Sequence, residues 1–209
     1  MGPPGAGKGT QAEKIVDTFK VCHISTGDMF REAIKAQTEM GKLASSFIDK
    51  GQLVPDSVTV GIVKERLVKA DCKEQGFLLD GFPRNLEQAR ALDQILEDLD
   101  YQLTGVINIV VDKDALAKRI VGRQICKSCG ASYHVVLKKP LKEGICDRCG
   151  SPLYVRPDDT IEVLSSRLNV YEEQTAPLLD FYNQKGLVKD IDGDQDLDNV
   201  FAQIKEYLD

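Results

Sequence analysis

The chain has 209 residues, of which 42% are hydrophobic and 29% are charged, a composition typical of a globular protein with one good core. A net charge of −6 disfavours a general nucleic-acid binder, because such proteins usually carry a basic surplus. No apolar run is long enough to cross a bilayer and no signal peptide opens the chain. We therefore expect a cytoplasmic protein that binds neither nucleic acid nor membrane.

The first predicted element is a glycine-rich loop over residues 2–10, Gly-Pro-Pro-Gly-Ala-Gly-Lys-Gly-Thr. Its glycines allow successive backbone N–H groups to turn inward around a polyphosphate. Lys8 adds a mobile positive charge, and Thr10 can place a hydroxyl near a magnesium ion. The helix expected over residues 11–19 points its positive end at the same anion. The loop therefore predicts a nucleoside triphosphate site. The alternative is a glycine-rich turn without a ligand, and the spacing of the four glycines, the lysine and the threonine argues against it.

A loop of this type normally follows a buried strand, whereas only Met1 precedes Gly2 in this sequence. Either an internal methionine is given as the start or the chain has been trimmed. Without that first strand we expect a gap in the central sheet, with the backbone groups beside it left unpaired.

Short apolar runs alternate with helical patterns along the rest of the chain. The runs that predict strands are residues 21–24, 77–79, 106–111 and 187–191. Asp56 and Asp112 are predicted helix N-caps, and Pro177 should kink or end the helix that begins near Asp158. This alternation predicts an α/β fold with a parallel sheet covered on both faces, whose ligands lie at the carboxyl ends of the strands.

Two segments interrupt the alternation. Residues 25–54 have helical patterns and no strand, which indicates a small helical lobe. Residues 122–159 hold four cysteines and show little helical periodicity, which indicates an inserted mini-domain. The core domain is then made of residues 1–24, 55–121 and 160–209.

The inserted segment carries two Cys-x-x-Cys pairs, each followed by glycine, and these predict a zinc site. The four ligands would be Cys126, Cys129, Cys146 and Cys149. Four thiolates fill a tetrahedral coordination sphere, so we expect the zinc to be structural. A redox motif and iron are the alternatives, and His134 is a competing ligand that we expect to pack or to face solvent instead.

Two further cysteines, Cys22 and Cys72, stand alone in the sequence. We favour a structural role for both.

Several arginines stand beside glycine, proline or aspartate at predicted element ends, namely Arg84, Arg123 and Arg156, while Arg31 and Arg167 lie on predicted helices. Any one of them could be a solvated charge or an ion-pair partner. As a group they suit phosphate binding, because a planar guanidinium binds phosphate through two hydrogen bonds.

Together these features closely resemble bacterial adenylate kinases, in the form whose lid carries zinc, over nearly the whole chain. The motifs that carry the resemblance are the loop at 2–10, HISTGDMFR at 23–31, QLVPD at 52–56, FLLDGFPR at 77–84, GR at 122–123 and RPDD at 156–159. The resemblance implies a P-loop three-layer fold with a parallel sheet. It also implies that residues 25–54 form an AMP-binding lobe and residues 122–159 a zinc-stabilised lid.

The resemblance also implies the residues of each site. Those that would bind ATP are Gly5, Ala6, Gly7, Lys8, Gly9, Thr10, Arg123, Ser132, Tyr133 and, through its backbone, Gln195. Those that would bind AMP are Thr26, Arg31, Gln52, Leu53, Val54, Gly81, Phe82, Pro83, Arg84, Gln88, Arg156 and Arg167, with Gln88 facing the adenine. Asp80, and with less support Asp28, would orient magnesium-bound waters, whereas we interpret Asp112 as a helix cap.

The implied reaction is reversible phosphoryl transfer from MgATP to AMP, giving two ADP, by a monomer. The acceptor oxygen is already anionic and needs no general base, so the chemistry needs cations that cancel the repulsion between two polyanions. The expected catalytic residues are Lys8, Arg84, Arg123, Arg156 and Arg167. A UMP or CMP kinase is the nearest alternative, and an ATP-responsive zinc-ribbon regulator is an alternative from a different class.

Overall fold

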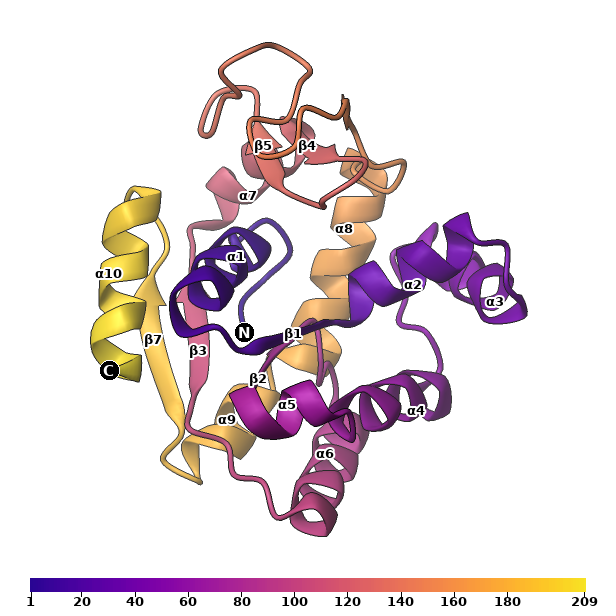
Figure 1. Ribbon diagram of the computed structural model, residues 1–209, viewed down its shortest axis with the longest axis vertical. Helices are drawn as coiled ribbons and strands as arrows, with labels where there is room; N and C mark the ends of the chain where they lie inside the picture. Colours follow the sequence, from indigo (N-terminus) through magenta and orange to yellow (C-terminus); the bar gives the residue numbers. More distant parts are fainter.

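Parallel strands in two pairs form the centre of the computed structural model, which describes residues 1–209. β1 (Cys22–Ser25) pairs with β2 (Phe77–Asp80), and β3 (Val106–Val110) pairs with β7 (Val188–Asp192). The N-terminus lies between the two pairs (Figure 1), where Met1 accepts a hydrogen bond from the N–H of Ile109 at 3.1 Å. All four strands begin and end within one residue of the runs that predict them.

Helices cover both faces of these strands, as the alternating pattern predicts. They are α1 (Lys8–Phe19), α2 (Thr26–Lys35), α3 (Glu39–Ile48), α4 (Asp56–Leu67), α5 (Ala70–Gln75), α6 (Leu86–Leu99), α7 (Lys113–Val121), α8 (Ile161–Val170), α9 (Leu178–Asn183) and α10 (Leu197–Leu208). Side chains on alternate positions of the strands face opposite layers. Cys22 and Ile24 of β1 pack against α4 and α6 on one face, while Ile191 of β7 packs against α1 and α10 on the other.

Of the three helix boundaries that the sequence predicts, those at Asp112 and Pro177 are confirmed and the one at Asp56 is wrong. Asp112 caps α7 by accepting a hydrogen bond from the N–H of Asp114. The helix of residues 161–170 passes into a π-helical turn, and Pro177 then begins a separate helix, so the predicted break is confirmed. Asp56 is not an N-cap: it is the first residue of α4, and its carboxylate accepts hydrogen bonds from the side chains of Asn85 and Gln88.

Two parts of the chain project from the layered core (Figure 1). One consists of α2 and α3, which pack against each other. The other lies between the end of α7 and the start of α8 and contains the antiparallel strands β4 (Arg123–Cys126), β5 (Ser132–His134) and β6 (Leu153–Tyr154). None of the helices combines the length and the hydrophobicity that spanning a membrane requires.

The core contains one polar group whose removal should be favourable. Tyr182 of α9 is 1% exposed, burial raises its pKa, and its hydroxyl makes no hydrogen bond. A buried hydroxyl without a partner costs about 1–3 kcal/mol. We expect Tyr182→Phe to raise the free energy of unfolding by about 1 kcal/mol, measured by urea unfolding.

Tyr207→Phe is the matched control, because the Tyr207 hydroxyl donates a hydrogen bond to the carbonyl of Leu187 at 3.1 Å. That variant should be destabilised by about 1 kcal/mol. A loss of stability in Tyr182→Phe would contradict this account of the core.

Candidate functional site

The glycine-rich loop wraps around the start of α1, as its sequence predicts. Gly7 precedes the helix with φ of 92°, and Gly2 has φ of 125°. A Cβ on Gly2 would lie 2.5 Å from the carbonyl oxygen of Ile109, so no other residue fits there. The first turn of α1 leaves N–H groups without intrahelical partners, and these face the loop together with the positive end of the helix.

The ammonium of Lys8 lies inside this loop. Its Nζ donates hydrogen bonds to the carbonyls of Gly2 at 2.7 Å and Pro3 at 2.8 Å. Burial, reinforced by the charges of Arg84, Arg167 and Arg123, lowers the pKa of Lys8 from 10.5 to about 7, although Asp80 acts in the opposite direction. An anion bound beside Lys8 would restore its charge, so the loop is preorganised for a negatively charged ligand.

Four arginines from separate segments extend this positive region. Arg84 donates from Nε to the carbonyl of Gly81 at 2.8 Å, and Arg123 donates from Nε to Asp159 at 2.8 Å. Arg167 Nη1 lies 3.4 Å from Asp158, and Arg156 Nη2 lies 3.3 Å from Asp28. Burial and neighbouring arginines lower the pKa values of Arg84, Arg156 and Arg167, that of Arg167 to about 10.

With Lys8 and Arg31, the site therefore gathers six positive side chains. The four aspartates among them, at positions 28, 80, 158 and 159, leave an excess of positive charge in a protein whose net charge is −6. Positive charges held close together repel one another, so this excess favours the binding of a polyanion.

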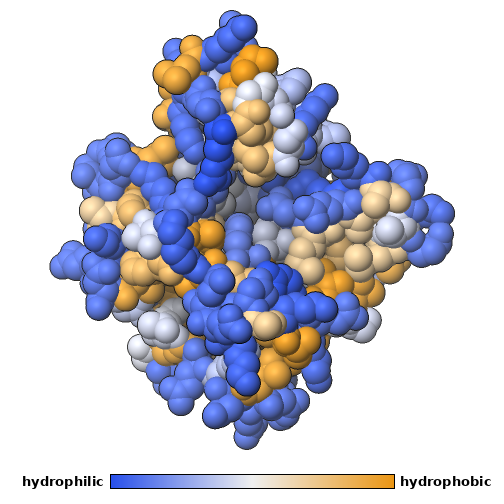
Figure 2. Space-filling model, in the orientation of Figure 1, coloured by the Kyte–Doolittle hydropathy of each residue, from blue (hydrophilic) through white to orange (hydrophobic).

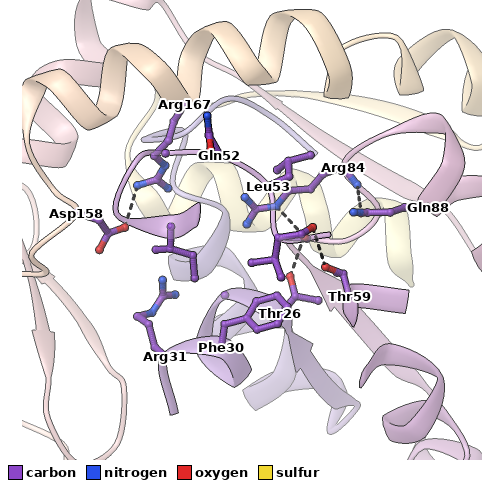
Figure 3. A pocket seen from close by; sticks show the side chains of 15 residues that line it. Thr26, Phe30, Arg31, Gln52, Leu53, Thr59, Arg84, Gln88, Asp158 and Arg167 are labelled. Atoms are coloured by element: carbon purple, nitrogen blue, oxygen red, sulfur yellow. Dashed lines mark hydrogen bonds and ion pairs between the residues drawn. The ribbon is translucent and has the colours of Figure 1, made fainter. Parts of the chain in front are cut away.

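A pocket opens beside these cations (Figure 3). Its lining includes most of the residues expected for the second nucleotide, namely Thr26, Arg31, Gln52, Leu53, Val54, Gly81, Arg84, Gln88 and Arg167. Thr26 donates from its hydroxyl to the carbonyl of Gly81 at 2.9 Å, which joins α2 to the end of β2. Phe82, Pro83 and Arg156 do not line the pocket, and the Phe82 side chain is buried in the core.

Sequence reasoning missed other residues that line this pocket, among them Phe30, Ile48, Thr59 and Asp158. Phe30 follows Thr26 by one helical turn, so the face of α2 that carries Thr26 could have indicated it. Thr59 comes from α4, which reaches the pocket only through the tertiary packing of the helices.

Hydrogen bonds on both sides fix the Gln88 amide. Its Nε2 donates to Asp56 at 2.7 Å, and its Oε1 accepts from the backbone N–H of Arg84 at 2.8 Å. One N–H and one oxygen lone pair remain for a ligand. Gln88 can therefore offer one donor and one acceptor to a base, in a fixed orientation.

Asp80 lies at the carboxyl end of β2, beside the loop. Its carboxylate is 3.7 Å from Nε2 of His23 and raises the pKa of that imidazole. Burial acts to raise the pKa of Asp80 itself, but His23, Lys8 and Arg84 outweigh burial and hold the pKa below its usual range. Asp80 is therefore an ionised carboxylate next to a phosphate-type loop.

Asp28 has a different environment from Asp80. Its carboxylate is 2.7 Å from Arg31 Nη2, and it also pairs with Arg156. These two arginines lower the pKa of Asp28 against the effect of burial. Asp28 thus joins α2 to the segment that precedes α8.

The projecting strands lie above α1 (Figure 1). The surface is hollowed between this projection and the one formed by α2 and α3 (Figure 2). Ser132 donates its N–H to Glu13 of α1 at 2.9 Å, and Arg148 lies 2.9 Å from Asp17. These contacts hold the inserted segment against the helix that follows the loop.

Tyr133 and Gln195, both expected at the ATP site, have different surroundings. The Tyr133 side chain is buried within the inserted segment, with its hydroxyl 3.5 Å from Cys146 Sγ. Gln195 is exposed in the loop between β7 and α10. Arg119 of α7, which sequence reasoning missed, donates to the carbonyl of Gly193 in this same loop at 2.9 Å.

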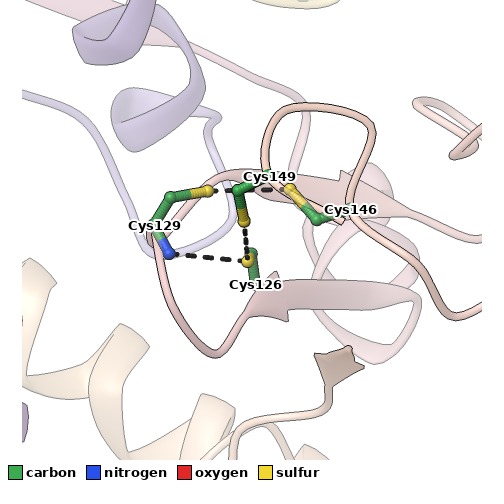
Figure 4. Close-up of side chains that lie close together, drawn as sticks. All are labelled: Cys126, Cys129, Cys146 and Cys149. Atoms are coloured by element: carbon green, nitrogen blue, oxygen red, sulfur yellow. Dashed lines mark hydrogen bonds between the residues drawn. The ribbon is translucent and has the colours of Figure 1, made fainter. Parts of the chain in front are cut away.

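The four cysteines of the inserted segment converge (Figure 4). The sulfurs of Cys126 and Cys149 are 3.4 Å apart, and those of Cys129 and Cys146 are 3.6 Å apart. A tetrahedral zinc site with Zn–S bonds of about 2.3 Å needs sulfurs about 3.8 Å apart, so the cluster is compatible with structural zinc. A hydrogen bond with the Tyr133 hydroxyl lowers the pKa of Cys146 to about 6, which favours the thiolate that a metal binds.

His134 lies outside the cysteine cluster. Its Nε2 is 3.0 Å from the carbonyl of Lys118, and its Nδ1 accepts a hydrogen bond from the N–H of Val136. His134 thus holds the inserted segment against α7.

Comparison with known proteins matches this arrangement to one family. The family model described as "Adenylate kinase" matches residues 1–187. A protein of Bacillus pumilus named adenylate kinase is 60% identical over 208 residues, which cover 100% of this chain and 95% of the relative. Proteins of the same name from Geobacillus sp. and Carboxydothermus hydrogenoformans are 57% and 55% identical over 208 residues, covering 100% of this chain and 96% and 97% of the relatives.

The depressed pKa of Lys8 predicts a specific pH dependence of stability. Between pH 7 and 10.5 the unfolded chain keeps a proton on Lys8 that the folded chain has lost, so stability should rise with pH across this window. We expect Lys8→Met to stabilise the ligand-free protein at pH 7 by up to about 4 kcal/mol and to remove this part of the slope. Urea unfolding at a series of pH values measures both effects.

Lys42→Met, at an exposed position of α3, is the control and should leave the slope unchanged. A Lys8→Met variant that is less stable than the parent at pH 7 would show that the buried ammonium stabilises the loop rather than straining it.

Proposed function

Because the chain belongs to the adenylate kinase family and therefore catalyses reversible phosphoryl transfer from MgATP to AMP, giving two ADP, we propose that the cationic cleft performs this reaction. The observation that carries the proposal is the convergence of six positive side chains between the phosphate-type loop and the pocket. Membership of the family sets aside a zinc-ribbon regulator.

The mechanism follows from electrostatics. Two unit charges about 4 Å apart repel by about 4 kcal/mol at an effective dielectric of about 20, and several phosphate pairs repel at once. Lys8 and Arg123 would neutralise the ATP phosphates, and Arg84 would neutralise the approaching AMP phosphate. Arg156 and Arg167 would reach between the two nucleotides. The attacking oxygen is anionic, so the site needs no general base.

Magnesium, when bound with ATP, adds further positive charge at the phosphates. Asp80 fits the task of holding its waters, because this carboxylate is ionised and lies beside the loop. Asp28 is a weaker candidate, because two arginines already pair with it.

We propose that the pocket of Figure 3 binds AMP. The free donor and acceptor of Gln88 would meet the base, with Phe30 and the segment 52–54 along its faces. Arg31, Arg84 and Arg167 would surround the phosphate. Because few groups contact the base, UMP and CMP are the acceptors against which selectivity must be measured.

The ATP side would be formed by the loop at residues 5–10 and by the inserted segment above α1. Arg123 and Ser132 would cover the phosphates, with Tyr133 contributing through its backbone because its side chain is buried. Gln195 would contact the adenine through its backbone, and Arg119 would position the loop that carries it.

We propose that residues 25–54 and 122–159 close as two lobes over a core of residues 1–24, 55–121 and 160–209. Closure would exclude water, which otherwise competes with AMP as acceptor. Contacts that cross between these segments support the proposal, such as the Ser166 hydroxyl donating to the carbonyl of Lys50 at 2.8 Å.

We also propose that Cys126, Cys129, Cys146 and Cys149 hold a structural zinc ion, which would stabilise a segment too small to build its own core. Cysteines that bind a metal instead of pairing as disulfides suit a cytoplasmic, reducing compartment. We propose a monomer, because one chain supplies every side chain of the cleft.

The assignment of Arg84 to AMP gives a test of the site. We expect Arg84→Ala to raise KM for AMP by a factor of about 100 and KM for ATP by less than about 5, since losing a charge-assisted contact costs about 3 kcal/mol. A coupled assay of ADP formation measures both, with AMP, UMP and CMP as acceptors.

Arg90→Ala is the control, because Arg90 is an exposed arginine of the neighbouring α6. Equal losses for ATP and AMP in Arg84→Ala would overturn the site map. Equal rates with UMP or CMP in the parent would overturn the proposed selectivity.

The zinc proposal predicts that Cys129→Ser lowers the metal content below one ion per chain and lowers Tm by several degrees. Elemental analysis and thermal unfolding measure these effects. Ser128→Ala changes the adjacent exposed residue and should alter neither quantity. Stoichiometric zinc in Cys129→Ser would rule out the four-cysteine site.

A further inference from the structure

The two cysteines that stand alone in the sequence lie in contact in the structure. Cys22 of β1 and Cys72 of α5 are 50 positions apart, and their sulfurs are 2.6 Å apart. Both belong to the core cluster between β1 and α4, and they are 5% and 1% exposed. This pair is separate from the zinc-type cluster and plays no part in the mechanism proposed above.

The surroundings of the two sulfurs differ. Arg66 Nη1 lies 3.0 Å from the sulfur of Cys72, and the same guanidinium pairs with both carboxylate oxygens of Asp71 at 2.9 and 2.6 Å. The Arg66 guanidinium therefore contacts the Cys72 sulfur directly, whereas it makes no hydrogen bond to Cys22. Burial raises the pKa of Cys22 to about 12, so Cys22 stays a thiol.

These contacts distinguish between two uses of the cluster formed by Cys22, Asp71 and Cys72. A metal cation would have to lie beside the Arg66 guanidinium and compete with it for the Asp71 carboxylate. A disulfide is neutral and uses only the two sulfurs already in contact. It would therefore meet no repulsion from Arg66 and would leave the Arg66–Asp71 ion pair in place.

We propose that Cys22 and Cys72 are a modification site, at which hydrogen peroxide converts the two thiols into a reversible disulfide. The Cys72 thiolate attacks one oxygen of the peroxide, which breaks the O–O bond, oxidises the sulfur to a sulfenic acid and releases hydroxide that takes up a proton. The Cys22 sulfur then attacks the sulfenic sulfur and forms the S–S bond. The sulfenic hydroxyl leaves with the Cys22 proton as water, so two thiols and one peroxide give one disulfide and two waters.

The bond would tie β1 to α5 and close a covalent loop around the segment that contains α2, α3 and α4. A cross-link over a loop of this length stabilises a protein mainly by restricting the unfolded chain. Neither cysteine lines the nucleotide pocket, so the disulfide should change stability more than turnover.

The test uses the full zinc-loaded chain, reduced and then treated with hydrogen peroxide. Trypsin cleaves after Lys20, Arg31, Lys69 and Lys73, so the linked product joins peptides 21–31 and 70–73 and is identified by mass without reduction. We expect this linked product, a rise in Tm on the order of 5–10 °C that dithiothreitol reverses, and a kcat within about twofold of the reduced enzyme.

Cys22→Ala and Cys72→Ala are the matched controls, and neither should show the peroxide-dependent rise in Tm. Arg66→Met should slow formation of the linked peptides about tenfold or more, since it removes the positive group that contacts the Cys72 sulfur. Activity of each reduced variant reports that it is folded.

Recovery of Cys22 and Cys72 as free thiols, or as separate sulfinic acids, would overturn the proposal. A rise in Tm that persists in either alanine variant would also overturn it, by assigning the effect to the zinc-type cysteines. Unchanged oxidation in Arg66→Met would overturn Cys72 as the attacking sulfur.

Discussion

The cleft gathers positive side chains that repel one another unless a negatively charged ligand lies among them. This repulsion is the constraint on which the rest of the structure depends. Lys8 is held among Arg84, Arg123 and Arg167, and its pKa falls to about 7 because burial and these neighbours disfavour its charge. Aspartates such as Asp158 and Asp159 compensate only part of the excess. The cleft is therefore strained when empty and complementary to two polyanions, which is how a phosphotransferase without a general base can lower its barrier.

The fold supplies the rigidity that this strain requires. The loop is anchored at the start of α1, the pocket residues stand at the ends of β1 and β2, and the hydrophobic clusters on both faces hold these strand ends in place. The segments at 25–54 and 122–159 bring further arginines over the core. If these segments close as proposed, charges from separate parts of the chain come together around the two substrates only when both segments are closed.

Much of this arrangement was predictable because it depends on local pattern. A phosphate loop needs glycines and a lysine in one short stretch, a buried strand needs a short apolar run, and a four-thiolate site needs two close pairs of cysteines. The side-chain roles were less predictable. Asp56 binds Asn85 and Gln88 instead of capping its helix, and the Tyr133 side chain turns into the inserted segment instead of toward the cleft.

The sequence by itself determined the α/β class, the phosphate loop, the inserted cysteine segment and the family, because each is encoded in contiguous residues whose spacing fixes their chemistry. Only the tertiary structure decided which distant side chains meet. It placed Thr59 in the pocket and brought Cys22 to 2.6 Å from Cys72, although nothing in either local sequence indicates the other. The reason is physical: such contacts depend on how helices pack across a sheet, and packing is a property of the whole core rather than of any segment.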